Sequence, residues 1–296
     1  MAGKTKTKYD PSEVFTAFIM LLPFLFILVV FILFPIGYTI FLSFTQYNLF
    51  KPPEFWGLTG WQRVLENELF IQKALPNTFK YVAIVVPIQT ALSLVIAFAM
   101  DQKIKFQRFF RTIYYLPSVT SSVVISLIFI WLFSPLGIVN QIFNLNINWL
   151  NDVNTAFYTI MILNVFTTTG TLMLIFLAGL QDIPKEVYEA ASIDGADKVQ
   201  TFWSVTIPLL RPVIFFVVTV GIIGCFQVFD QIFVMTNGGP LDSTTTVAYM
   251  IYKWSFRDTS IKMGLASVAS ILLTLIILVV TLLQRRLIEG SGTSVN

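Results

Sequence analysis

Residues 189–210 read EAASIDGADKVQTFWSVTIPLL, a polar and charged segment between two long apolar runs. The run before it, residues 153–181, has 29 positions without a charged side chain, and the run after it, residues 212–229, has 18. Charge-free runs of about this length predict transmembrane helices. A charged segment that connects two such helices lies in water, where it is better suited to bind a soluble partner than to support the helices themselves.

The first part of this segment has the residue pattern of a short helix that ends at a glycine. Pro184 suits the first helical position, because its missing N–H group would have no partner there. Glu186 and Glu189 fall in the first turns, where the helix dipole stabilises a carboxylate. Gly195 can adopt the left-handed conformation that commonly ends a helix. We therefore predict a helix that begins near Pro184 and is capped by Gly195.

A second short helix is predicted directly after this glycine. Asp197 can cap its N-terminus, and we expect it to run to about Val205 and to be closed by Pro208. Ala190 and Ala191 leave little side-chain bulk on the first helix. The backbone of a partner could therefore approach closely.

This segment resembles the EAA signature of the membrane subunits of bacterial ABC importers. The family pattern is Glu-Ala-Ala, three residues, Gly, nine residues, Ile, one residue and Leu-Pro. Val205 and Ile207 stand where the family has Ile and Leu, and both departures keep an aliphatic side chain. The positions that match the pattern are Glu189, Ala190, Ala191, Gly195 and Pro208.

The neighbouring residues are similar to those of the sugar and polyol branch of this family, the maltose-type permeases. AASIDGAD, TIPLLRP and the TNGGP of residues 236–240 carry this similarity, and the resemblance runs from about residue 15 to residue 287. It implies an all-α membrane protein with six transmembrane helices and a cytoplasmic coupling loop at residues 182–211. It also implies a permease subunit of an importer for a sugar, oligosaccharide or polyol, which works by alternating access.

The same resemblance implies a set of partners, because such a subunit has no ATP site and forms only half of the pathway. We expect a second permease subunit, with a paralogue favoured over a second copy of this chain, and two ATPase subunits in the cytoplasm. We also expect an extracytoplasmic substrate-binding protein, the sugar substrate and the lipids of the bacterial inner membrane, but no nucleic acid.

The composition independently indicates a membrane protein. Of 296 residues 56% are apolar and only 12% are charged, whereas a soluble domain has about 25% charged residues. We find no linker or repeat and expect a single domain, residues 1–296. The six transmembrane helices are predicted near residues 14–34, 81–100, 112–133, 156–180, 212–235 and 263–283.

Several classes of site are excluded by the residues that the chain lacks. It has no histidine and a single cysteine, Cys225, so neither a nucleophile–histidine pair nor a Cys/His metal cluster can form. It also has no Gly-x-x-x-x-Gly-Lys-Ser/Thr sequence, the loop that binds the phosphates of ATP. We therefore expect no catalytic site, no cofactor and no metal.

The distribution of Lys and Arg predicts the orientation in the membrane. With the N-terminus inside, the cytoplasmic segments hold 12 basic residues in 66 positions, and the outer segments hold seven in 95. Cytoplasmic loops are enriched in basic residues. The bias therefore places both termini and the coupling loop in the cytoplasm. The 12 basic residues are Lys4, Lys6, Lys8, Lys103, Lys105, Arg108, Arg111, Lys185, Lys198, Arg211, Arg285 and Arg286.

Polar residues within two predicted spans are candidates for contact with the substrate. Asn164, Thr168 and Thr171 are spaced i, i+4 and i+7, which places them on one face of a helix. Amide and hydroxyl groups exchange hydrogen bonds with the hydroxyls of a sugar. The resemblance adds that these three positions correspond to sugar-lining positions of the maltose-type subunits. Hydrogen bonding between helices is the alternative explanation.

A second polar group precedes residue 236. Gln227, Asp230 and Gln231 follow Phe226, whose ring could cover an apolar sugar face. By resemblance, Phe226 and Gln227 lie near the other sugar-lining positions. Asp230 is the one charge predicted inside a span. It could pair with a basic residue of a partner subunit or lie near the outer interface, so its role stays open.

Three other functions compete with this interpretation. A secondary transporter would commonly use intramembrane carboxylates or histidines as coupling sites, and this chain offers one Asp. A membrane-embedded enzyme would need an acid–base pair that is not apparent. An ABC permease for a non-sugar solute, such as an amino acid or peptide, agrees less well with TNGGP and with the residues around the EAA signature.

Overall fold

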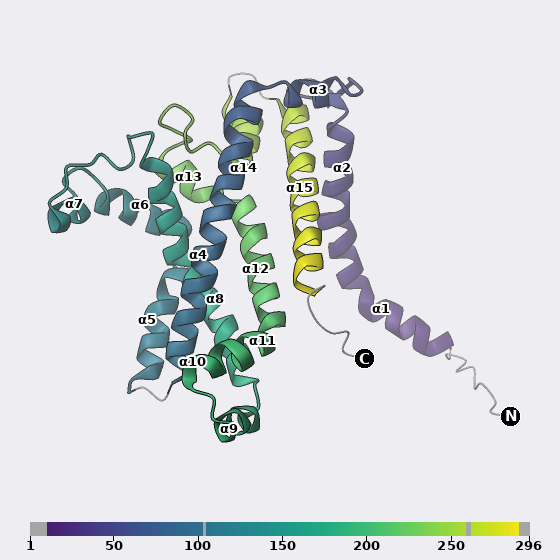
Figure 1. Cartoon of the computed structure of the whole chain (residues 1–296). Coiled ribbons are helices and arrows are strands. Elements are labelled where there is room, and N and C mark those ends of the chain that lie inside the picture. Colours follow the sequence, from purple (N-terminus) through teal and green to yellow (C-terminus); the bar gives the residue numbers. More distant parts are fainter. Residues whose placement is uncertain (1–10, 103–104, 259–261, 290–296) are drawn as a thin grey trace.

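The computed structural model describes residues 11–102, 105–258 and 262–289, and most of them are helical (Figure 1). Four of the basic residues used to predict orientation, Lys4, Lys6, Lys8 and Lys103, lie outside the described residues. Five helical segments are long and apolar enough to cross a membrane, and a bent pair of helices supplies a sixth if the pair is one span. The strands β1 (Thr45–Gln46) and β2 (Glu54–Phe55) form a small antiparallel pair. The all-α membrane fold is thus confirmed.

The first span is longer than the sequence indicated. Helix α1 (Pro11–Ile27), the π-turn η1 (Leu28–Leu33) and α2 (Phe34–Leu42) follow one another without a break, so the helix continues eight residues beyond the predicted end at residue 34. The N–H of Phe34 reaches back five residues to the carbonyl of Val29. This wider turn directly precedes Pro35, which cannot donate a hydrogen bond.

The same arrangement precedes two other prolines. The π-turn η2 (Phe70–Ala74) comes before Pro76, and η3 (Phe202–Thr206) comes before Pro208. In both, the residue before the proline donates its N–H to the carbonyl five residues earlier. A proline that follows a π-turn therefore begins a new helical turn here instead of ending the helix.

The core of the molecule is built around α4 (Leu75–Asp101) and α8 (Ala156–Gln181), which pack along each other. Helix α12 (Arg211–Phe226) packs against α4, and α15 (Met263–Glu289) against α12 and α2. The hydroxyl of the buried Ser93 donates to the carbonyl of Thr169, at 3.1 Å, and so links α4 to α8. Short hydroxyl side chains of this kind commonly bond transmembrane helices together.

The predicted third span, residues 112–133, is not one straight helix. Helix α5 (Gln107–Val119) and α6 (Ser122–Leu132) meet at an angle of 98°. Thr120 and Ser121 between them are extended, with ψ values of 142° and 130°. The break falls in the sequence SVTSS, whose hydroxyls compete for backbone hydrogen bonds. Helix α5 packs against α8, whereas α6 turns away and packs against α13 (Asp230–Met235) (Figure 1).

The fifth span, predicted at residues 212–235, is interrupted at residues 227–229, between α12 and α13. It ends at Met235, the predicted end, and the TNGGP turn follows, in which Asn237 and Gly238 have φ values of 52° and 84°. Tyr249 donates its hydroxyl to the carbonyl of Asn237 at 2.6 Å, and Arg257 donates to both residues. Burial raises the pKa of Tyr249, and the positive charge and hydrogen bond of Arg257 partly offset this rise.

Short helices lie at the two ends of the molecule. At the end that holds the β-strands is α3 (Thr59–Leu65), whereas α7 (Ile138–Phe143) lies to the side, beyond α6 (Figure 1). The short helix α14 (Val247–Tyr252) is followed directly by the π-turn η4 (Lys253–Arg257). At the opposite end are α9 (Lys185–Ile193), α10 (Lys198–Thr201) and α11 (Ile207–Leu209), with α9 projecting beyond the bundle (Figure 1).

Candidate coupling loop and translocation cavity

Helix α9 ends in a complete Schellman motif. Gly195 has φ of +80°, and its N–H donates to the carbonyl of Ser192 at 3.2 Å. The N–H of Ala196 donates to the carbonyl of Ala191 at 3.0 Å. These two hydrogen bonds satisfy carbonyls at the end of the helix. The left-handed position of such a motif, here residue 195, is usually glycine. The predicted cap at Gly195 is confirmed, while Pro184 is the residue that precedes the first helical turn.

For the second helix of the loop, the predicted N-terminal cap is confirmed and the predicted C-terminal end is wrong. The carboxylate of Asp197 accepts from the N–H of Gln200 at 2.7 Å and caps α10, as expected. Pro208 does not close the helix. The chain continues as a helix through η3 and α11 to Leu209, and α12 starts at Arg211. The loop is therefore connected to the fifth span by almost continuous helix.

The surface of the loop is more apolar than its charged sequence suggests. Glu189 and Ala190 are exposed. Ile193, Val199 and Trp203 are exposed to 86%, 66% and 65%. The sequence analysis did not single out these three, although apolar side chains in a segment expected to face water are themselves a signal. Exposed apolar groups beside charged ones are typical of a surface that a partner covers.

One contact attaches the loop to a membrane helix, and a second contact joins the two halves of the loop. The ring of Phe202 lies edge-to-face with that of Phe98 on α4, at 5.1 Å between centroids. Thr206 is buried, and its hydroxyl lies 3.4 Å from the hydroxyl of Tyr188 on α9. A force on α9 would therefore reach both α4 and α12.

A polar cavity of about 330 Å³ lies among the spans. It brings together the three predicted residues of α8, Asn164, Thr168 and Thr171. The side chain of Asn164 is only 6% exposed, and its Oδ1 has no hydrogen-bond partner. None of the described residues that line the cavity carries a formal charge. The others are Gln89, Pro117, Ser118, Thr120, Ser122, Ile125, Thr167, Leu172, Val220, Gly221, Gly224, Cys225 and Gln231.

Gln89 is one of the polar lining residues that the sequence analysis missed. It is 1% exposed, and its Oε1 accepts from the hydroxyl of Thr168 at 2.7 Å, which joins α4 to α8. Its Nε2 faces α12, where a Cβ on Gly221 would come within 2.6 Å of it. Gln89 is thus a contact among three spans. An amide in the middle of an apolar run was the signal that could have identified it.

The break between α5 and α6 contributes hydroxyl groups to the same cavity. Ser118 donates to the carbonyl of Thr167 at 2.6 Å and accepts from the N–H of Thr171 at 3.1 Å. The hydroxyl of Ser122 is buried without a hydrogen-bond partner. Ser118 therefore holds two helices together, whereas Ser122 is available to a ligand.

Only Gln231 of the second predicted group joins the first group in the cavity. Phe226 is buried to 1% exposure against Phe79, with 5.5 Å between ring centroids. Gln227 and Asp230 are exposed near the interruption of the fifth span and do not line the cavity, but Gln231 does.

A family model describes chains of this kind. Residues 89–290, which include the coupling loop, the cavity and the last three spans, match the model of the binding-protein-dependent transport system inner membrane component. The chain belongs to this family. The permease is therefore a multi-pass protein of the inner membrane, and the resemblance drawn from the EAA signature is confirmed.

Individual relatives cover nearly the whole permease. It is 34% identical over 269 residues to the probable ABC transporter permease protein YesP of Bacillus subtilis, covering 88% of this chain and 86% of that one. It is 33% identical over 281 residues to the arabinooligosaccharides transport system permease protein AraP of Halalkalibacterium halodurans, covering 92% and 87%.

A solved structure has the same fold. A chain of a bacterial ABC transporter involved in the import of the acidic polysaccharide alginate superposes with a TM-score of 0.82. The two chains are 21% identical, and the match covers 95% of this chain and 98% of that one.

Proposed function

We propose that the permease forms half of the pathway by which an ABC importer moves a sugar, oligosaccharide or polyol across the inner membrane. The observation that carries this proposal is the uncharged polar cavity, in which the Oδ1 of Asn164 is buried without a partner. A buried acceptor of this kind is costly unless a donor completes it. A hydroxyl group of a sugar is a suitable donor, and the permease relatives that carry sugars in their names support this class of substrate.

The coupling loop is the proposed docking site for an ATPase. Glu189, Ala190, Ala191 and Gly195 lie on or beside α9, and the exposed Ile193 adds apolar surface. Closure of two ATPase subunits would move α9, and with it α4 and α12 through the contacts of Phe202 and the continuous helix at Pro208. Such a rigid-body transition changes the side from which the cavity is open.

The remaining parts of the proposed assembly lie beyond this chain. A second permease subunit would complete the pathway, and a substrate-binding protein would deliver the sugar on the outer side. Gln227 and Asp230 stay candidates for substrate contact because both side chains are exposed, whereas Phe226 stays one only for a state in which its ring no longer packs against Phe79.

The cavity is tested by removing single polar groups. We expect Asn164→Ala and Thr171→Val to weaken uptake about twofold to tenfold, the equivalent of one lost hydrogen bond. Thr274→Val is the matched control, because the hydroxyl of Thr274 bonds the carbonyl of Ser270 on its own helix. Gln227→Ala reports whether the second group also contacts the sugar. Uptake that is unchanged in both cavity variants would favour the alternative, in which these groups only join helices.

Two rival functions give different results in membrane vesicles. A secondary transporter would accumulate the sugar with an ion gradient and without ATP. A permease for a non-sugar solute would bind an amino acid or a peptide in preference to a sugar. We expect uptake to need ATP, the ATPase subunits and a sugar-loaded binding protein.

A further inference from the structure

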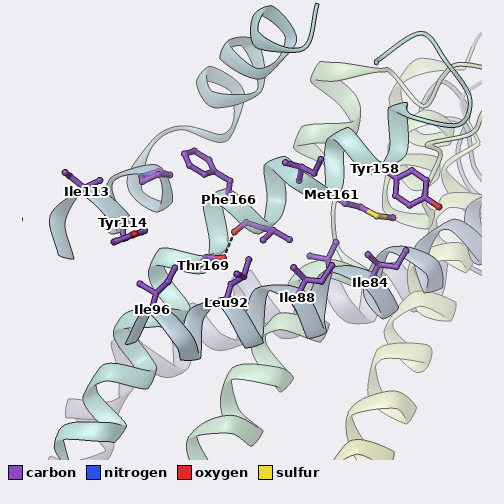
Figure 2. Close-up of a pocket in the computed structure, with 14 residues that line it drawn as sticks. Ile84, Ile88, Leu92, Ile96, Ile113, Tyr114, Tyr158, Met161, Phe166 and Thr169 are labelled. Atoms are coloured by element: carbon purple, nitrogen blue, oxygen red, sulfur yellow. Dashed lines mark hydrogen bonds between the residues drawn. The ribbon is translucent and has the colours of Figure 1, made fainter. Parts of the chain in front are cut away.

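A second hollow in the molecule is apolar and larger than the polar cavity. It is a groove of about 620 Å³ between α4 and α8. Ile84, Ile88, Leu92 and Ile96 form its wall on α4, at successive intervals of four residues (Figure 2). The facing wall on α8 and the end of the groove are formed by Tyr158, Met161, Ile162, Val165, Phe166, Thr169, Ile113, Tyr114 and Pro117, together with Val85 of α4.

The bend in the third span leaves this groove uncovered along most of its length. Helix α5 packs on α8 and closes one end of the groove, where Ile113 and Tyr114 lie beside Ile96 (Figure 2). Helix α6 turns away by 98° instead of continuing along α4 and α8. Ile88, Leu92 and Phe166 are therefore 45%, 43% and 50% exposed.

The lining of the groove favours a flexible apolar chain over another helix. Transmembrane helices pack closely where small residues such as glycine, alanine and serine line the interface, and the groove is lined mainly by isoleucine, leucine, valine and aromatic residues. The hydroxyl of Thr169 in the lining already donates to the carbonyl of Val165, as the dashed line in Figure 2 shows. Thr169 therefore does not require a polar ligand in the groove, and the rest of the lining is apolar apart from the hydroxyls of Tyr114 and Tyr158.

The length of the groove matches one leaflet of a bilayer. From Ile84 to Ile96 the helix rises about 18 Å, and the hydrocarbon of one leaflet is about 15 Å thick, half of the bilayer core. The groove thus has room for one acyl chain that enters at the Ile84 end and stops at α5.

A positive charge stands at the open end. Lys80 lies one turn before Ile84 on α4, and its ammonium is 4.5 Å from the ring centroid of Tyr158. The side chain of Lys80 is exposed. Lysine beside tyrosine is typical of the level at which lipid headgroups lie, and basic residues there attract acidic lipids. We propose that the groove binds one acyl chain of an acidic phospholipid of the membrane, and that Lys80 binds its phosphate.

The test uses the assembled transporter in nanodiscs that contain equal amounts of phosphatidylglycerol and phosphatidylethanolamine. Native mass spectrometry counts the phospholipids that stay bound and identifies their headgroups. We expect Leu92→Trp to fill the groove and to abolish the tightly bound lipid. Val95→Trp is the matched control, because Val95 is on the same helix, is 63% exposed and does not line the groove.

The charge at the open end is tested separately. We expect Lys80→Gln to lower the ratio of bound phosphatidylglycerol to phosphatidylethanolamine about fivefold, the contribution of one basic residue near a membrane surface. Lys73→Gln, the control, removes an exposed lysine that lies farther along the chain from the groove. A ratio that does not change in Lys80→Gln would overturn the assignment of the phosphate to Lys80.

A photocrosslinking amino acid in place of Ile88 identifies the occupant directly, even where a tryptophan variant fails to fold. An adduct with the mass of a phospholipid supports the proposal. An adduct with another subunit would overturn it and assign the groove to a protein interface. Equal lipid retention in the Leu92→Trp and unmodified transporters would also overturn it.

Discussion

At the scale of single residues, Gly195 gives the sharpest test of the coupling loop. A Cβ at this position would meet no atom within 4 Å, so any cost of substitution comes from the backbone, which has φ of +80°. We expect Gly195→Val to abolish ATP-driven uptake, because a β-branched residue strongly disfavours this conformation. Gly195→Asn should keep most of the uptake, since asparagine tolerates the left-handed region. Equal uptake by the two variants would show that the turn does not matter for coupling.

Glu189 tests the charge of the same loop. The Glu189→Lys variant reverses an exposed charge on α9, the helix that we propose faces the ATPase. We expect normal insertion into the membrane but loss of transport, measured by uptake after surface and total protein levels have been matched. Glu68→Lys, at an exposed carboxylate outside the coupling loop, is the control for a change of net charge. Normal uptake by Glu189→Lys would count against docking at this face.

Gln89 links three spans through one buried amide, so its replacement should lower stability. We expect Gln89→Ala to reduce the free energy of unfolding by about 1–3 kcal/mol, because a buried hydrogen bond is lost and the Thr168 hydroxyl loses its acceptor on α4. Thermal unfolding in detergent, followed by tryptophan fluorescence, measures this effect. Gln72→Ala, an exposed position before α4, is the control. A melting temperature equal to that of the control would refute the structural role.

At the scale of helices, Gly170 sets the distance between α5 and α8. A Cβ there would lie 2.2 Å from the carbonyl oxygen of Tyr114 and 2.6 Å from the hydroxyl of Ser118. We expect Gly170→Ala to destabilise the protein by about 1–3 kcal/mol through overpacking. The same substitution at Gly37 meets no atom within 4 Å and should be neutral or slightly stabilising. Both are measured by the same thermal unfolding, and similar melting temperatures would contradict the close packing.

Features that depend only on residues close together in the sequence could be predicted from the sequence. The Schellman turn at Gly195 and the cap at Asp197 depend on residues within a few positions, and the shared face of Asn164, Thr168 and Thr171 follows from helical spacing alone. The contact of Gln89 with Thr168 joins residues 79 positions apart, and no local pattern reveals it.

The two broken spans were not predicted for a related reason. Residues 112–133 and 212–235 are apolar along almost their whole length. Hydropathy detects this apolar character, but it carries no information about where a helix changes direction. The hydroxyl groups near Ser121 permit the bend of the third span, but the packing of α6 on α13 and of α5 on α8 fixes it. The helix was wrongly predicted to end at Pro208. In the π-turn before this proline, the N–H of Ile207 bonds the carbonyl of Phe202, and the helix continues through the proline.

At the scale of the whole molecule, the permease should depend on partners for energy. The coupling loop, residues 182–211, is too short for a nucleotide-binding domain, and the chain has no phosphate-binding loop. We expect the purified chain neither to bind nor to hydrolyse ATP. Hydrolysis should appear with the cognate ATPase and rise when the second permease and loaded binding protein are added, because a loaded binding protein shifts the population of states. Hydrolysis by the chain alone, free of contaminating ATPase, would overturn this assignment.

The 98° bend also decides the sidedness of everything that follows it. Helices of 13 and 11 residues rise about 20 and 17 Å, so neither half crosses a core of about 30 Å unaided. If the pair crosses, the coupling loop and the N-terminus share one side. If the pair enters the membrane and returns to the same side, the number of crossings before α9 falls by one. Helix α9 would then lie on the side opposite to the cytoplasm and could not meet an ATPase there. The lone Cys225 is buried, so a Ser192→Cys variant can be labelled selectively with a membrane-impermeant maleimide. We expect labelling in inside-out vesicles and none in intact cells.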